Sequence, residues 1–151
     1  MKSFLIYLIY PILTILLTGC GDQVRDEFPQ TSFVGYFNLN HSEYSGTVFT
    51  AQRDRDGNRV GISGIIVYQN SADEYYAFER MCPHEKKHNC KVHIDPDEDT
   101  NIAECKCCGS RFLIANENGE VIEGKAPPPG LKRYRTAFDR QTNQLVVSSG
   151  R

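Results

Sequence analysis

The sequence predicts an all-β domain, built as a sandwich or small barrel of short antiparallel strands. Short runs of aromatic and β-branched residues recur along the chain and are separated by turn residues, the spacing typical of such folds. Eight Tyr and eight Phe can supply a core, while twelve Gly and seven Pro favour frequent turns. No segment after residue 20 shows a helical apolar period over three turns. The length of 151 residues fits one domain.

The first half of the body contains three predicted strands. Residues 32–40 alternate aromatic and β-branched side chains in the way that a half-buried strand does. A charged hairpin tip follows, in which Asp56-Gly57 is a strong turn dipeptide. Residues 62–69 and 74–80 are the next two strands, separated by a polar turn.

The second half continues the same pattern. Short strands and a closing hairpin are expected at residues 102–105, 111–115, 120–122, 132–139 and 144–148. Polar turn residues such as Asn-Gly separate them, which keeps the strands short.

The N-terminus reads MKSFLIYLIYPILTILLTGC, where one cation precedes an apolar run over residues 4–17. This run is shorter than the about 20 residues that a spanning helix needs, and it has the length of a signal-peptide core. It ends in Leu-Thr-Gly-Cys, which resembles the bacterial lipoprotein box. That resemblance implies a signal peptide over residues 1–19, lipidation of Cys20 and a polar tether over residues 20–31. The alternative is an uncleaved hydrophobic anchor with an incidental cysteine.

These features place the domain in the bacterial cell envelope, as a membrane-anchored lipoprotein that faces the periplasm or the cell surface. The expected contact with the membrane is through the lipid anchor. The formal net charge is −2, and nothing in the charge pattern indicates a nucleic-acid partner.

Soft metal ligands gather in two short boxes of the sequence. Cys82-Pro83-His84 forms the first box, and Cys105-Lys106-Cys107-Cys108-Gly109-Ser110 forms the second. Three thiolates and one imidazole suit iron–sulfur or zinc chemistry rather than magnesium or calcium. The sequence therefore predicts a metal site between two hairpin loops, with Cys82, His84, Cys105 and Cys108 as the candidate ligands.

The two boxes resemble those of Rieske iron–sulfur proteins, which carry C-x-H in the first loop and C-x-x-H-G-S in the second. The resemblance covers about residues 32–149 and includes a proline loop at residues 123–131. It implies an antiparallel β-sandwich with a small cluster-binding subdomain, whose loops lie within residues 81–113. It also implies a [2Fe-2S] cluster and one-electron transfer to a redox protein partner whose identity the sequence does not give. The domain alone is not expected to be an enzyme, although it could be the redox subunit of one.

The resemblance also implies roles for the remaining cysteines. High-potential Rieske domains join their two cluster loops by a disulfide, and Cys90 and Cys107 stand near the corresponding positions. An exported domain lies in a compartment where disulfides persist. By the same resemblance, Ser110 is expected to donate a hydrogen bond to the cluster.

The second box departs from the family pattern, because Cys108 stands where Rieske proteins have their second histidine. A thiolate there adds a negative charge beside the iron, so we expect a potential below the usual Rieske range of about −150 to +300 mV. Two alternatives remain open: a structural zinc ion on the same ligands, and a cluster-free domain with two disulfides among its cysteines. Either would make the domain a binding or structural module. His88 and His93 lie in a polar segment, residues 85–96, and are expected to be solvated.

Overall fold

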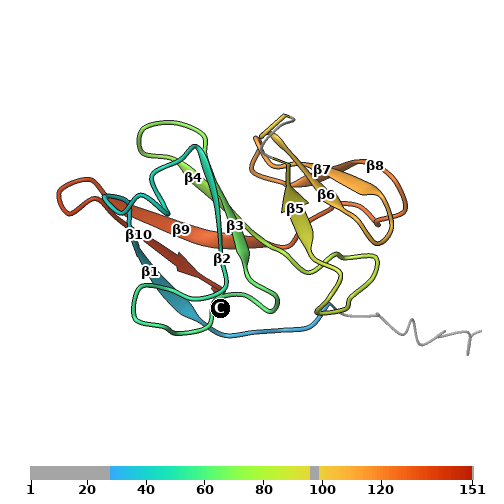
Figure 1. Ribbon diagram of the computed structural model, residues 1–151, viewed down its shortest axis with the longest axis horizontal. Coiled ribbons are helices and arrows are strands. Elements are labelled where there is room, and N and C mark those ends of the chain that lie inside the picture. The colour runs from blue at the N-terminus through green and yellow to red at the C-terminus, as the bar shows by residue number, and fades with distance from the viewer. Residues whose placement is uncertain (1–27, 96–98, 151) are drawn as a thin grey trace, which may run out of the picture.

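A computed structural model describes residues 28–95 and 99–150, and within them the chain forms ten strands and no α-helix (Figure 1). The predicted all-β class is therefore confirmed. The strands are β1 (Val34–Asn38), β2 (Val48–Ala51), β3 (Ile65–Gln69), β4 (Tyr75–Glu79), β5 (Val92–Ile94), β6 (Ile102–Cys105), β7 (Ser110–Leu113), β8 (Glu120–Glu123), β9 (Arg133–Asp139) and β10 (Gln144–Ser148).

The strands form two antiparallel sheets. The larger sheet has the order β1-β10-β9-β4-β3-β2, and the smaller has the order β5-β6-β7-β8. Figure 1 shows the small sheet beside the large one, formed by the chain between β4 and β9. Strands β4 and β9 are themselves neighbours, with Ala77 opposite Tyr134. The small sheet is thus an insertion that leaves and re-enters the large sheet at adjacent strands.

Two hydrophobic cores lie on opposite faces of the central strands β3 and β4. Successive side chains of a strand point to opposite faces. Ile65 and Val67 accordingly pack into the first core, formed within the large sheet. Ile66 and Phe78 pack into the second core, which lies between the large sheet and the small one. Burial on both faces explains why these strands read as continuous apolar runs.

The sequence prediction missed two short strands, β2 and β5. Strand β5 lies in the segment that was expected to be a polar loop, so His93 sits on a strand and is only partly exposed. Val92 is its one fully buried residue and lies opposite Cys105 of β6. A three-residue strand with charged neighbours is too short to show a period in the sequence, and its structure depends on its pairing with the next strand, β6.

The small sheet also extends beyond the expected cluster-binding loops, because β8 pairs with β7 after residue 113. The predicted signal peptide, Cys20 and residues 20–27 of the tether lie outside the described residues. Within the described ranges, the structure contains no helix that is long and apolar enough to cross a membrane.

Candidate metal centre

Two loops with the same turn geometry form the site. In the first, which follows β4, the N–H of Lys86 donates to the carbonyl of Cys82 at 2.9 Å. In the second, between β6 and β7, the N–H of Gly109 donates to the carbonyl of Cys105 at 2.8 Å. Lys86 and Gly109 both have positive φ, 51° and 68°. The glycine adopts this conformation readily, whereas the lysine adopts it against its usual preference.

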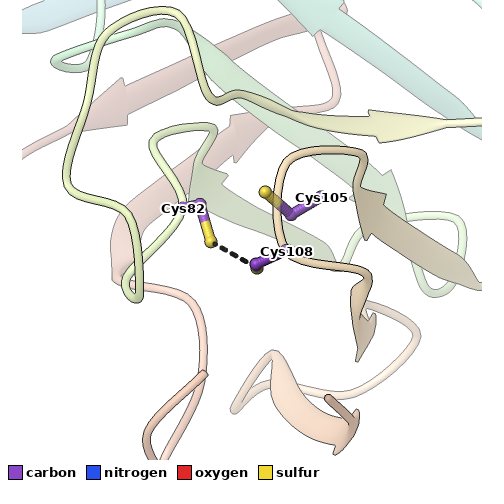
Figure 2. A group of neighbouring side chains, drawn as sticks. All are labelled: Cys82, Cys105 and Cys108. Carbon is purple, nitrogen blue, oxygen red and sulfur yellow. Dashed lines mark hydrogen bonds between the residues drawn. The ribbon is translucent and has the colours of Figure 1, made fainter. Parts of the chain in front are cut away.

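These loops bring three free thiols together, those of Cys82, Cys105 and Cys108. Their sulfur atoms lie within 4.8 Å of one another (Figure 2). Cys82 Sγ and Cys108 Sγ are 3.6 Å apart. Cys82 and Cys105 are fully buried, while Cys108 is partly exposed. The cluster of thiols therefore has a buried side and a side that reaches solvent.

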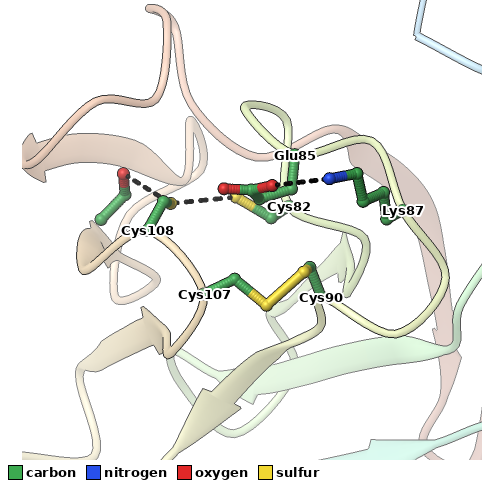
Figure 3. The surroundings of a disulfide bond; sticks show 7 residues. Cys82, Glu85, Lys87, Cys90, Cys107 and Cys108 are labelled. Atoms are coloured by element: carbon green, nitrogen blue, oxygen red, sulfur yellow. Dashed lines mark hydrogen bonds and ion pairs between the residues drawn. A yellow bond between two sulfur atoms is a disulfide. The ribbon is translucent and has the colours of Figure 1, made fainter.

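A disulfide between Cys90 and Cys107 joins the same two loops (Figure 3). This is the pairing that the Rieske resemblance implies. Its Cα atoms are 5.7 Å apart. Since Cys107 is the immediate neighbour of Cys108, the bond holds the second loop against the first and restricts the separation of the thiols.

His84, the fourth predicted ligand, does not belong to the thiol group. Its side chain is exposed, and the group that could hold a metal contains only the three cysteines among the described residues. The structure therefore brings together three of the four predicted ligands. His84 lies two residues after Cys82, at the rim of the same loop, and its role as a ligand stays a prediction.

Ser110 links the second loop to the proline loop. Its side chain is fully buried, and its hydroxyl oxygen accepts the N–H groups of Lys125 at 2.9 Å and Ala126 at 3.0 Å. A hydroxyl has two acceptor lone pairs and one proton to donate. Both lone pairs are thus occupied, so the hydroxyl proton is available to Cys108 Sγ, 3.2 Å away, once that sulfur is a thiolate. Donation from Ser110 to the cluster stays a prediction, and the structure places its hydroxyl beside the sulfur of a candidate ligand.

The thiols of Cys82 and Cys108 differ in acidity. Burial raises the pKa of Cys82 to about 12, although N–H groups of Glu85 and His84 act in the opposite direction. Burial also acts to raise the pKa of Cys108, but hydrogen bonds from Ser110 and from the Cys82 thiol outweigh it and lower that pKa. Of these two thiols Cys108 is therefore the more acidic, and Cys82 donates a hydrogen bond to it.

The buried carboxylate of Glu79 holds the start of the first loop through hydrogen bonds. Glu79 is fully buried at the end of β4, and it accepts the N–H of Met81 at 2.7 Å and the hydroxyl of Tyr134 at 2.6 Å. It also accepts the N–H groups of Ile62 at 2.6 Å and Ser63 at 2.8 Å. Sequence reasoning missed this role. The available signal was a charge placed directly after the apolar run of a central strand.

The donor set fits a thiolate-bound metal centre. Three soft sulfur ligands converge from two loops, and such ligands select iron–sulfur clusters or zinc. Cys82 and Cys108 each accept backbone N–H groups. Those donors stabilise negative charge on sulfur, which a ligand thiolate carries.

Comparison with known proteins bears on the same region. A family model described as the Rieske [2Fe-2S] domain matches residues 42–136, which is more than half of the chain and includes both cysteine boxes. No curated protein and no solved structure gives a significant match to the chain.

Proposed function

Since the chain belongs to the Rieske [2Fe-2S] domain family, we propose that it is a membrane-anchored bacterial lipoprotein that carries out one-electron transfer. The proposed cofactor is a [2Fe-2S] cluster held by Cys82, His84, Cys105 and Cys108. The proposed location is the bacterial cell envelope, with the lipid on Cys20 as the attachment to the membrane.

The observation that carries this proposal is the convergence of three thiols in two loops that a disulfide joins. A buried thiol cluster without a metal would leave Cys82 and Cys105 as weak hydrogen-bonding groups in the core. With iron bound, the same sulfurs are ligands. His84 supplies the fourth position by turning inward from the rim of the first loop.

With the cluster bound, the site would take up and release one electron reversibly. The protein's own residues then determine where that electron enters and leaves. Cys82 and Cys105 are closed off by the second core, whereas Cys108 is partly exposed and His84 is exposed. The redox partner is therefore expected to approach the side formed by Cys108 and His84.

Cys108 and Ser110 tune the centre in opposite directions. The thiolate of Cys108 adds negative charge that a histidine would not, which favours the oxidised state and lowers the potential. The hydroxyl of Ser110 donates to that sulfur at 3.2 Å and withdraws part of the charge.

A structural zinc ion is the second candidate, and one distance favours it. Zinc bound at about 2.3 Å in a tetrahedron holds two thiolates about 3.8 Å apart. The Cys82 and Cys108 sulfurs lie 3.6 Å apart, and both would be ligands of one ion. If Cys82 and Cys108 instead held different irons of a cluster, their sulfur atoms would need to lie further apart than this.

The experiment is to express the full chain, purify it without air, and record its visible spectrum together with its iron, sulfide and zinc content. The proposal expects broad sulfide-to-iron bands that bleach with dithionite, and equal amounts of iron and sulfide. Cys108→Ser should abolish or strongly alter these bands. Cys108→His should retain them and raise the potential.

Cys20→Ser serves as the matched control, since it removes a cysteine outside the metal centre. It should keep the colour and lose attachment to the membrane fraction. A colourless protein with one zinc per chain would establish the second candidate instead. A protein that remains colourless and metal-free after reconstitution would overturn both.

A further inference from the structure

A polar cleft lies away from the three thiols, between the segment that joins β2 to β3 and the end of the first metal loop. Its volume is about 330 Å³. Its lining residues are Gln52, Arg53, Arg59, Val60, Gly61, Ile62, Ser63, Gly64, His88 and Lys91. None of them is acidic, although the whole chain carries a formal charge of −2.

Three permanent cations converge on this cleft. Arg53 and Arg59 come from the two sides of a hairpin whose backbones pair with each other. Lys91 comes from the opposite wall, directly after the disulfide cysteine Cys90. His88 stands on the same wall, where its Nδ1 lies 3.3 Å from the hydroxyl of Ser63. Arg53, Arg59, His88 and Lys91 therefore border the same cleft.

Ion pairs within the described part of the chain do not neutralise these cations. In the part of the chain that the structure describes, Arg59 and Lys91 form no ion pair, and Arg53 donates only to the carbonyl of Gly57. The carboxylate of Glu79 lies beneath the floor of the cleft, where it accepts the N–H groups of the lining residues Ile62 and Ser63. It is fully buried and also accepts hydrogen bonds from Met81 and Tyr134.

The floor of the cleft is closely packed backbone. Gly61 and Gly64 have φ of +68° and +105°, so the backbone turns tightly here, and a side chain at Gly61 would meet Gly64 O at 2.6 Å. Behind Gly64 lies the nearly buried guanidinium side chain of Arg80, whose Cδ is 3.4 Å from where a Cβ would be. Arg80 donates to the carbonyl of Val92 and lies within hydrogen-bond distance of His93 Nδ1, while the charge of Glu79 acts on its guanidinium group.

We propose that this cleft is a binding site for a phosphate-type oxyanion. Guanidinium groups present a planar fork that binds two oxygens of a phosphate at once, and an ammonium adds a point charge. A carboxylate offers two oxygens in one plane and one charge. A tetrahedral oxyanion with two charges instead offers oxygens in several directions, which suits cations from two walls, Arg53 and Arg59 on the hairpin and Lys91 on the metal loop. Free phosphate presents this chemistry in full, and the phosphodiester of an anionic phospholipid headgroup presents it with one charge and two free oxygens.

The site is tested by following amide and histidine NMR signals of the full chain while sodium phosphate is added. A parallel titration with sodium chloride at matched ionic strength removes general screening. Saturable shifts at residues 61–64 and His88 with phosphate alone are the expected result. Arg59→Gln and Lys91→Gln should each weaken the affinity about tenfold or more, because each removes a charge-assisted contact.

Arg55→Gln is the matched control. Arg55 belongs to the same hairpin and carries the same charge, but it does not line the cleft and lies over Tyr36. It should leave phosphate binding unchanged. Equal shifts in phosphate and chloride, or equal weakening by all three variants, would overturn the proposal, since both results indicate screening of a general surface charge.

The two sources of phosphate are separated by placing the full chain in bicelles of phosphatidylcholine, with or without phosphatidylglycerol. Shifts at the cleft only in the anionic bicelles identify a lipid headgroup as the ligand. Unchanged cleft signals in both, with free phosphate still binding, identify a soluble ligand. The NMR shifts at the cleft do not depend on the thiols, so this test is independent of the proposed electron transfer.

Discussion

Ser110→Ala tests the hydrogen-bond network that connects the proline loop to Cys108. The substitution removes one hydroxyl and leaves the N–H groups of Lys125 and Ala126 without their acceptor. A buried donor left unsatisfied costs about 1–3 kcal/mol. Ala126 N lies in a buried bond and Lys125 N in a part-buried one. We therefore expect the free energy of unfolding to fall by about 2–4 kcal/mol, the lower part of the sum of two such costs.

The same substitution acts on Cys108, which loses the donor 3.2 Å from its sulfur. That hydrogen bond is one of the interactions that lower the pKa of Cys108, after burial has acted to raise it. Without it the pKa of Cys108 rises, so less thiolate is present in the metal-free reduced protein. Alkylation of Cys108 by iodoacetamide at mildly alkaline pH should become slower, as followed residue by residue with mass spectrometry.

Urea unfolding measures the first effect, and Ser149→Ala provides its control. Ser149 also accepts a backbone N–H through its hydroxyl, from Phe33 at 3.2 Å, but it lies near the C-terminus. Its loss should cost about 1 kcal/mol and leave the alkylation of Cys108 unchanged. If Ser110→Ala unfolds at the wild-type urea concentration and Cys108 reacts at its original rate, the hydroxyl does not hold the two loops in the way described.

Three further predictions address the supports of the site. Replacing Cys90 and Cys107 together by serine should lower the stability by about 3 kcal/mol, since their bond closes a sequence separation of 17 residues; a calorimetric scan with unchanged Tm would contradict this. Glu79→Gln should lower the free energy of unfolding, measured with urea, by about 3–5 kcal/mol, because an amide oxygen cannot accept hydrogen bonds from four donors. A Glu79→Asp variant as stable as the wild type would show that the donors are dispensable. Burial acts to raise the pKa of Asp54, but hydrogen bonds from Asn58 and Asp56 outweigh it and lower that pKa. The Asp54 contribution to stability is thus complete above the unfolded pKa of about 3.9 and is lost as the pH falls through the folded value. The stability deficit of Asp54→Asn should therefore shrink in acid, and a deficit that is constant with pH would exclude this role.

Strands with strong periodicity or a clear turn at each end could be predicted from the sequence. Residues 102–105 and 144–148 were placed with the observed bounds of β6 and β10. Strand β5 could not be predicted, because its only buried residue, Val92, becomes apolar core through contact with β6. The short segment around Val92 lies between charged residues, and its residue types do not show that it will be buried against another strand.

The metal centre, too, was predictable from the sequence only in part. The spacing of Cys82, Cys105 and Cys108 in two boxes was sufficient to predict that their sulfurs meet. The contribution of Glu79 was not predictable, since three of its four donors, Ile62, Ser63 and Tyr134, belong to other segments of the chain. The direction of the Ser110 proton was also beyond the sequence, because it depends on which backbone groups of the proline loop occupy the hydroxyl oxygen.

The adjacency of β4 and β9 has a consequence for engineering. The chain leaves the large sheet after Glu79 and returns at Lys132, and the carbonyl of Lys132 accepts the N–H of Glu79 at 2.8 Å. The two cut ends of the intervening piece are therefore a single hydrogen bond apart. This one continuous stretch contains both cysteine boxes, the disulfide and the proline loop, so it can be transferred to another protein as a single insertion. It could be grafted between two neighbouring antiparallel strands of another sheet, provided that the host offers an apolar face in place of Ile66 and Phe78.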